Sequence, residues 1–201
     1  MIIDWCRPQK SKKYKGMGLF ATRDIPAGTI VIIEESCPNC TTVRESELDD
    51  FGPKMKAYLL EHLPVTRLSH PLFLKFCDDR IGFINHSCDA NVLEAFPYYN
   101  DICVRDIRKG EEITYDYRLL DDDGVHYDCL CGSQDCVGFV TCQWPAPDAI
   151  VRMWMARITE AVKRMPRVEQ PLEQYIIRKG WKGMLSEFYR EWAKKKRGGK
   201  P

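Results

Sequence analysis

The sequence predicts a mostly β domain with a helical insert and a helical C-terminal extension, an α+β chain in which short strands dominate. Apolar, β-branched segments separated by Gly and Pro fill the first part of the chain. Long helices do not alternate with them, as a βαβ fold would require. After Pro147 the apolar residues recur at helical spacing. The length of 201 residues suits one domain and a modest appendage.

The expected strands are short and lie between turn residues. They cover residues 18–22, 29–35, 91–99, 102–107 and 113–117. Residues 46–63 interrupt them with a helical pattern, in which Pro53 suits a first turn and Met55 and Leu59 fall on one face. We therefore expect a helical insert over residues 36–79.

Three helices are expected in the C-terminal extension, residues 147–201. The first has apolar positions at Ile150, Val151, Trp154, Ile158 and Val162, and the last has them at Trp181, Met184, Leu185, Phe188 and Trp192. We expect Asp148 to cap the first helix and a short helix near residues 172–178 to end before Gly180. Periodic apolar stripes usually indicate packing rather than a ligand site.

Composition places the chain among ordinary globular proteins, with 44% hydrophobic and 29% charged residues. No apolar run approaches the ~20 residues of a membrane helix, and the first residues lack the apolar stretch of a signal peptide. We expect an intracellular protein that is neither secreted nor bound to a membrane. In a reducing compartment its ten cysteines are expected as metal ligands or reactive groups rather than disulfides.

The charge is divided between the two parts of the chain. Residues 1–146 hold 16 Lys and Arg against 23 Asp and Glu, a net −7, and residues 147–201 hold 14 against 6, a net +8. An acidic body suits a basic peptide substrate, and a basic tail suits nucleic acid, an acidic protein surface or nuclear import. Two solvated surfaces of opposite sign are the plainer alternative.

A cysteine cluster near residue 130 has the spacing of a metal knuckle. Cys129, Cys131 and Cys136 lie within eight residues, next to Gly132, and a tetrahedral zinc ion needs one more ligand. The candidates for that ligand are Cys88, Cys142, Cys37 and Cys40. Three unligated thiols in a loop are the alternative.

A second metal site is a further hypothesis. It would be built from Cys37 and Cys40 with Cys77, His62 or His70. The alternative is that Cys37 and Cys40 are two ordinary semi-buried thiols.

Three other segments carry polar or special residues. Residues 15–21 contain G-x-G-x-x-A, but a dinucleotide-binding turn must open a helix, and here Pro26 follows. These glycines more simply let the backbone approach a ligand or turn between strands. The polar residues 85–91 must be organised by hydrogen bonds to one another, to backbone or to a ligand. Tyr115 and Tyr117 fall at strand spacing, which places both on one face, as packing or as an aromatic-lined site.

Four motifs in order, GMGLFA, RIGFINHSCDAN, GEEITYDY and CLCGSQDC, resemble the SET-domain family of S-adenosylmethionine-dependent protein lysine methyltransferases with a post-SET zinc motif. The match runs from about residue 15 to residue 139. It implies a SET fold of small sheets with knot-like threading, an exception to the rarity of knots. The chain would then have four parts. These are a short N-terminal segment (residues 1–14), a SET domain (15–118) with its helical insert (36–79), a post-SET zinc segment (119–146) and a basic helical extension (147–201).

The resemblance also implies three sets of site residues. Tyr117 would be the catalytic tyrosine, and Tyr115 falls where the family alternates Phe and Tyr to limit the number of methyl groups, with Tyr favouring mono- or dimethylation. The cofactor S-adenosyl-L-methionine would be contacted by Lys15, Gly16, Met17, Gly18, Asn85, His86, Tyr117 and Leu130. A structural Zn²⁺ would be held by Cys88, Cys129, Cys131 and Cys136.

These residue types suit methyl transfer to an amine. A lysine amine titrates near pH 10.4, so a proton masks it at neutral pH, and an apolar aromatic channel that disfavours ammonium helps to release it. Tyr115, Tyr117 and Phe83 suit such a wall, and aromatic faces also attract cationic methyl groups.

We therefore expect methylation of a lysine in a basic protein or peptide, with a histone tail as the favoured substrate and mono- or dimethylation as the outcome. A catalytically inactive SET-like module that binds a peptide and a methyltransferase of non-histone proteins are the alternatives. Nucleic-acid contact through residues 194–197 and Lys200 is a further one, and the same basic tail is a candidate nuclear import signal.

Overall fold

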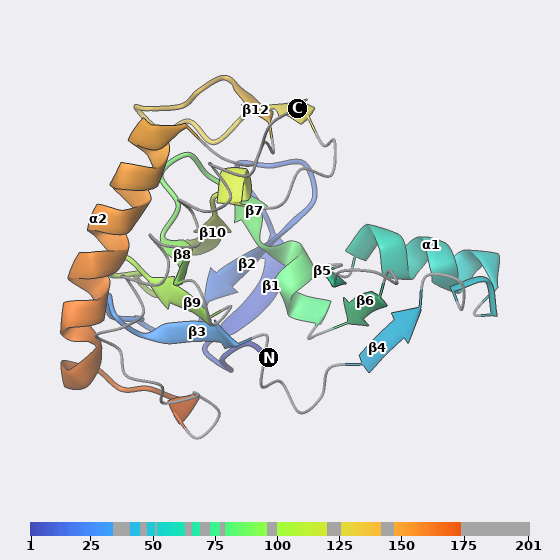
Figure 1. The fold of residues 1–201 in the computed structure, drawn as a ribbon, viewed down its shortest axis with the longest axis horizontal. Coiled ribbons are helices and arrows are strands. Elements are labelled where there is room, and N and C mark those ends of the chain that lie inside the picture. Colours follow the sequence, from blue (N-terminus) through green and yellow to red (C-terminus); the bar gives the residue numbers. More distant parts are fainter. Residues whose placement is uncertain are drawn as a thin grey trace.

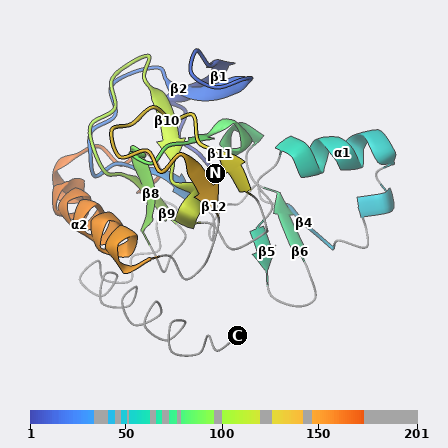
Figure 2. The ribbon, with the colours of Figure 1, turned by 90° about the horizontal axis from the view of Figure 1, so that it is seen from above.

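The computed structural model describes residues 1–33, 41–44, 48–50, 52–62, 66–68, 73–76, 79–95, 100–119, 126–141 and 147–173. A curled seven-stranded sheet forms the body of the molecule, and one long helix lies along its side (Figure 1). A small unit of one helix and three strands lies at the opposite end, as the second view also shows (Figure 2). The predicted fold class, mostly β with an insert and a C-terminal helix, is confirmed.

The main sheet mixes antiparallel and parallel pairs. Its strands are β1 (Cys6–Lys10), β2 (Met17–Ala21), β3 (Ile30–Ile33), β7 (Asn85–His86), β8 (Val92–Ala95), β9 (Asn100–Cys103) and β10 (Glu112–Tyr115). They follow the order β1-β2-β10-β8-β9-β3, with β7 added beside β10. Strands β7 and β8 run parallel to β10, and the other pairs are antiparallel. The central strand β10 therefore joins the N-terminal hairpin to the segment that carries the polar residues 85–91.

The insert is less helical than the sequence predicts. Helix α1 (Pro53–His62) begins at Pro53, as expected for a proline in a first turn. The insert also contains a separate sheet of β4 (Thr41–Arg44), β5 (Thr66–Leu68) and β6 (Phe73–Phe76) in the order β4-β6-β5, which we did not predict. Met55, expected on the apolar face of the helix, is 49% exposed.

The C-terminal part begins with a hairpin of β11 (His126–Asp128) and β12 (Phe139–Thr141), followed by helix α2 (Asp148–Arg164). Asp148 was expected to cap α2, and this is wrong. Pro147 takes the N-cap position without a side-chain hydrogen bond, so Asp148 is the first helical residue. The two further predicted helices lie outside the described residues, apart from Leu172 and Glu173.

The described chain also contains short 3-10 helices, among them η2 (Asp79–Phe83), η3 (Tyr117–Leu119) and η4 (Met165–Arg167). The strand expected over residues 113–117 ends at Tyr115, because η3 begins at Tyr117. None of the helices in the described ranges is long and apolar enough to cross a membrane.

One apolar core joins the sheet to α2. The IVII run of β3 is buried throughout, as expected for an apolar strand covered on both faces. From α2 the core receives Val151, Trp154, Met155, Ile158 and Ala161, which recur at helical spacing. The helix approaches the sheet closely at Gly28, where a Cβ atom would lie 2.8 Å from the carbonyl oxygen of Ala161. The first helix of the extension is therefore packed as part of the main domain.

Candidate functional site

The polar residues 85–91 are held by the backbone of β10. Strand β7 pairs with it in parallel, with Asn85 opposite Thr114 and His86 opposite Tyr115. The fully buried Asn91 donates from Nδ2 to the carbonyl oxygen of Glu112 over 2.8 Å and accepts the N–H of Thr114 at Oδ1, also over 2.8 Å. Asn91 thus satisfies two backbone groups of the strand that leads to Tyr115.

The ring of His86 links Tyr117 to the cysteine cluster. The backbone N–H of Tyr117 donates to Nδ1 over 3.1 Å, and Nε2 lies 3.3 Å from Sγ of Cys88. Because Nδ1 accepts, the neutral ring carries its proton on Nε2 and directs it at the sulfur. Burial lowers the pKa of His86 to about 4, although the carboxylate of Asp116 opposes this shift. The ring is therefore neutral at physiological pH.

Tyr117 lies in an aromatic cluster with His86 and Tyr127. The ring centroid of Tyr117 is 5.6 Å from that of His86 and 6.1 Å from that of Tyr127, and the His86 and Tyr127 centroids are 5.9 Å apart. The half-buried Tyr117 donates its hydroxyl proton to the carbonyl oxygen of Ile84. Sequence reasoning missed Tyr127, whose only signal was its position two residues before Cys129.

Tyr115 lies at the end of β10 and is almost completely buried, with 8% exposure. Its hydroxyl group donates to Oε2 of Glu94 on β8 over 3.3 Å. The strand-spacing argument for Tyr115 and Tyr117 does not apply, because only Tyr115 belongs to the strand. The two hydroxyl groups have different acceptors, Glu94 for Tyr115 and Ile84 for Tyr117.

The Lys15–Gly18 segment lies beside Asn85, as the sequence-predicted cofactor set requires. Nδ2 of Asn85 donates to the carbonyl oxygen of Met17 over 3.0 Å and to Oε1 of Glu112 over 2.6 Å. Gly16 has a φ of +116°, a conformation that other residues rarely adopt. Lys15 is exposed, and the side chain of Met17 is 43% exposed. The structure therefore brings Met17 and Gly18 next to Asn85, with Lys15 and the side chain of Met17 open to solvent.

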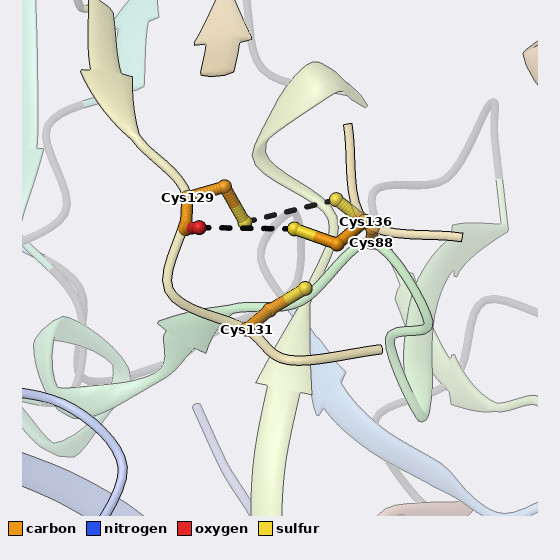
Figure 3. Close-up of side chains that lie close together, drawn as sticks. All are labelled: Cys88, Cys129, Cys131 and Cys136. Carbon is orange, nitrogen blue, oxygen red and sulfur yellow. Dashed lines mark hydrogen bonds between the residues drawn. The ribbon is translucent and has the colours of Figure 1, made fainter. Parts of the chain in front are cut away.

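Four cysteines lie close together (Figure 3). Cys88 follows β7, and Cys129, Cys131 and Cys136 come from the loop between β11 and β12. Their Sγ atoms all lie within 4.8 Å of one another, and those of Cys88 and Cys129 are 3.8 Å apart. A tetrahedral zinc ion with Zn–S bonds of about 2.3 Å separates its sulfur ligands by about 3.8 Å. The donor set and its geometry therefore fit zinc.

The loop geometry around the thiols is suited to metal binding. Gly132 and Gly138 adopt φ values of +62° and +75°, and the N–H of Cys129 donates to the carbonyl oxygen of Gly138 over 2.7 Å. Burial disfavours a thiolate at Cys131, but hydrogen bonds to Ser133 outweigh it and lower the pKa of Cys131 to about 6. Burial raises the pKa of Cys88. Because zinc binds thiolates, metal binding at this group must displace the remaining thiol protons.

Tyr14, absent from the predicted set, closes the cluster from the N-terminal side. It packs against the cysteines and donates its hydroxyl proton to the carbonyl oxygen of His86 over 2.5 Å. Leu130, a predicted cofactor residue, lies between two of the cysteines and is 61% exposed. Val137 and Phe139 of the same segment are 48% and 53% exposed, so this segment exposes three large apolar side chains.

The predicted second metal site cannot be placed in the same way. Cys37, Cys40, Cys77 and His70 lie outside the described residues, as does the side chain of His62. Cys142, a candidate for the fourth zinc ligand, also lies outside them. Among the residues that the structure describes, Cys88 completes the group of four.

The polar residues at the end of β7, the aromatic cluster and the four thiols lie next to one another in this small β domain, and the thiols could hold a metal ion. The SET-domain profile matches residues 16–118 of this chain, about half of its length. The chain belongs to the SET-domain family.

Three curated relatives illustrate the similarity. A histone-lysine N-methyltransferase of Arabidopsis thaliana, ASHR3, is 37% identical over 81 residues, covering 37% of this chain and 16% of that protein. The histone-lysine N-methyltransferase trr of Drosophila melanogaster is 29% identical over 131 residues, covering 62% and 5%. An H3 lysine-36 specific histone-lysine N-methyltransferase of Candida albicans is 28% identical over 173 residues, covering 78% and 19%. The chain spans less than a fifth of the length of these relatives.

Among solved structures, a Plasmodium falciparum protein described as a histone methyltransferase matches with a TM-score of 0.39 and 20% identity. The match covers 58% of this chain and 95% of that chain.

Proposed function

We propose that this chain transfers methyl groups from S-adenosyl-L-methionine to the ε-amine of a lysine in a basic protein, with a histone tail as substrate. Membership of the SET-domain family and the names of its curated relatives support the reaction class. Within this proposal Tyr117 is the catalytic residue, and the residues beside Asn85 and the segment around Leu130 hold the cofactor.

The observation that carries the proposal is the hydrogen bond of the Tyr117 hydroxyl group to the carbonyl oxygen of Ile84. Because its proton is directed at Ile84, the phenolic oxygen keeps its lone pairs for an N–H or a polarised C–H group of the reactants. The rings of Tyr117, His86 and Tyr127 form an apolar wall beside it. Because such a wall excludes water, it disfavours the protonated form of the lysine amine. The faces of the rings also attract the cationic methyl groups of the cofactor and the product.

The reaction is an in-line displacement that needs positioning more than covalent chemistry. When bound, S-adenosyl-L-methionine supplies an electrophilic methyl carbon on a sulfonium. The lysine amine, after losing a proton to solvent, forms the N–C bond with its lone pair while the C–S bond breaks and the electron pair goes to sulfur. Tyr117 orients the amine at the methyl group, and the aromatic cluster excludes water from that point.

The zinc ion proposed here is structural. Held by Cys88, Cys129, Cys131 and Cys136, it would tie the end of β7 to the segment that carries Leu130. Coordination of the ion by all four cysteines would hold the exposed apolar side chains of this segment near the aromatic cluster. The proposed parts of the chain are the N-terminal segment 1–14, the SET domain 15–118 with insert 36–79, the zinc segment 119–146 and the extension 147–201.

Tyr115 supports a preference for mono- or dimethylation. A tyrosine hydroxyl occupies space that a phenylalanine would leave for a further methyl group, and here Glu94 holds that hydroxyl in place. A histone tail as substrate would also place the enzyme at chromatin in the nucleus. The net −7 of residues 1–146 suits a Lys-rich tail.

The test is incubation with isotopically labelled S-adenosyl-L-methionine and recombinant core histones, and separately with a whole-cell extract. A Tyr117→Phe variant serves as the control, because it removes the hydroxyl and keeps the ring. We expect label on a histone that depends on Tyr117. Label only in the extract would redirect the substrate to a non-histone protein, and no transfer by a chain that binds the cofactor would favour a peptide-binding module.

A further inference from the structure

We propose that helix α2 of the C-terminal extension is part of the catalytic unit, and that Trp154 is a positioning residue that acts on the site through Asp116. This inference rests on the proposed function, since it assigns a role in the same site. The inference rests on the contact between the buried indole of Trp154 on α2 and the carboxylate of Asp116, the residue before Tyr117.

Trp154 is fully buried and donates from Nε1 to Oδ2 of Asp116 over 2.9 Å. The two residues are 38 positions apart, so this bond joins the extension to the end of β10. Asp116 itself is 1% exposed. A buried carboxylate is costly unless hydrogen-bond donors surround it, and one of its donors comes from outside the residues that match the SET-domain profile.

Arg118 supplies three further donors to Asp116. Its Nε donates to Oδ1 over 2.8 Å and its Nη2 to Oδ2 over 2.6 Å, while its backbone N–H reaches Oδ1 over 3.2 Å. The same Nη2 lies 3.4 Å from the carbonyl oxygen of Cys88. The Asp116–Arg118 pair therefore fixes the short 3-10 helix on which Tyr117 lies and contacts the backbone of a cysteine in the proposed zinc site.

Asp116 also faces the aromatic cluster. Its Oδ1 is 3.8 Å from Nδ1 of His86, the atom that accepts the N–H of Tyr117. Any rotation of the carboxylate would change the position of Arg118 and the surroundings of His86 together. From α2, Trp154 donates to Oδ2, the other oxygen of this carboxylate.

A second contact from α2 reaches the same segment. Arg157 donates from Nη2 to the carbonyl oxygen of Ala90 over 2.6 Å and pairs with Asp89 at 3.1 Å. Ala90 lies between Cys88 and the buried Asn91, so α2 holds both strand ends from which the site is built. Packing alone would explain the burial of Trp154, but it would not require these two polar contacts with the 85–91 and 116–118 segments.

The test compares Trp154→Phe with Ile158→Val in the full chain. The first variant removes the indole N–H and keeps an aromatic ring, and the second makes a small cavity one turn along the same buried face of α2. For each variant the thermal unfolding midpoint, the dissociation constant of S-adenosylhomocysteine by calorimetry and the KM for S-adenosyl-L-methionine with core histones are measured.

We expect Trp154→Phe to weaken S-adenosylhomocysteine binding and raise the KM for S-adenosyl-L-methionine by roughly five- to twentyfold. Ile158→Val should stay within about twofold of the wild type in both quantities. A purely structural role lowers the folded fraction without changing the affinity of the folded molecules. Equal affinities in the two variants would therefore overturn the inference and leave the proposed function intact, whereas a wild-type chain that neither binds nor methylates would overturn the proposed function first.

A double-mutant cycle with Asp116→Ala, which removes both acceptor oxygens, tests the route of the effect. If Trp154 acts through Asp116, adding Trp154→Phe to Asp116→Ala should weaken S-adenosylhomocysteine binding by no more than about twofold further. Effects that multiply would contradict action through Asp116. The comparison with Ile158→Val decides the inference independently, including the case in which Asp116→Ala does not fold.

Discussion

Gly18 and Glu112 approach each other so closely that a side chain at position 18 would displace the Glu112 carboxylate. A Cβ atom there would lie 2.1 Å from Oε1 of Glu112 and 3.1 Å from Nδ2 of Asn85. Moving the Glu112 carboxylate would break two hydrogen bonds, because Ser11 donates to its Oε2 over 3.0 Å and Asn85 donates to its Oε1 over 2.6 Å. The second glycine of the GMGLFA motif is thus needed for contact with a side chain of the protein.

Gly18→Ala should destabilise the protein by about 1–3 kcal/mol, the usual cost of overpacking. It should also weaken S-adenosylhomocysteine binding, because the displaced carboxylate no longer fixes the amide of Asn85. Urea unfolding and calorimetry measure the two effects. Gly110→Ala is the control, since Gly110 has a φ of +83° in an exposed turn with nothing within 4 Å of a built Cβ. If Gly110→Ala loses as much affinity as Gly18→Ala, the role of the Gly18–Glu112 contact is refuted.

Zinc removal should unfold the segment between β11 and β12 and lower the stability of the whole domain. We expect about one zinc per chain by elemental analysis, and a fall of roughly 10 °C or more in the unfolding midpoint with a strong chelator.

Cys136→Ser should lower the zinc content, because only three thiolates of the group of four remain to bind the ion. Cys103→Ala is the matched control, a buried cysteine of β9 outside the group of four. Full zinc content in Cys136→Ser would contradict the assignment, and two zinc ions per chain would support the site at Cys37 and Cys40.

The strands and the helix that the sequence predicts best are those with dense apolar patterns. The β-branched run of β3 and the helical stripe of α2 report burial directly. Strand β1 (Cys6–Lys10) was missed because its CRPQK sequence lacks an apolar alternation, and it forms by pairing with β2. The conformation of β1 thus depends on pairing with a neighbouring strand, and the local sequence does not encode that pairing.

Some residues of the candidate site could likewise be found from the sequence, and others could not. The spacing of Cys129, Cys131 and Cys136 in the chain is itself the signal of a metal knuckle, so those residues could be found without a structure. The bond of Trp154 to Asp116 joins residues far apart in the chain, and Trp154 fits the apolar stripe of a helix as well as any packing residue. Such long-range polar contacts have no sequence period and become visible only when the chain is folded.

Acid should destabilise the turn before β10 through Glu111. Partial burial alone would raise the pKa of this carboxyl, but the Arg108 N–H and the Arg105 guanidinium outweigh it, so the pKa of Glu111 is lowered overall. Arg105 lies 2.5 Å from Oε1, and the N–H of Arg108 lies 3.0 Å from Oε2. Because the folded pKa is below the unfolded one, the stabilisation is fully present above about pH 4.5 and is lost as the pH falls through the folded pKa.

Glu111→Gln should therefore reduce the free energy of unfolding at pH 7 and leave it closer to the wild-type value at low pH. Urea unfolding measured at several pH values between about 3 and 7 checks this. Glu160→Gln, in an exposed i,i+3 pair with Lys163, is the control for removing a surface carboxylate. A difference between wild type and Glu111→Gln that is constant with pH would show that the lost interaction does not depend on ionisation.

Tyr115→Phe should raise the number of methyl groups added to each lysine. The hydroxyl of Tyr115 is held by Glu94 over 3.3 Å, and its removal leaves space beside the proposed lysine channel. Mass spectrometry of the modified substrate measures the distribution of methylation states, and an unchanged distribution would defeat the prediction.

Glu94→Gln separates the space filled by this hydroxyl from the way it is held. A neutral amide oxygen still accepts the Tyr115 proton, but more weakly than a carboxylate does. If the orientation of the hydroxyl limits methylation, Glu94→Gln should shift the distribution in the same direction as Tyr115→Phe and by a smaller amount. If only the volume of the hydroxyl matters, Glu94→Gln should leave the methylation states as in the wild type while Tyr115→Phe changes them. Adding Glu94→Gln to Tyr115→Phe should then cause no further shift, because the group that Glu94 holds is already absent.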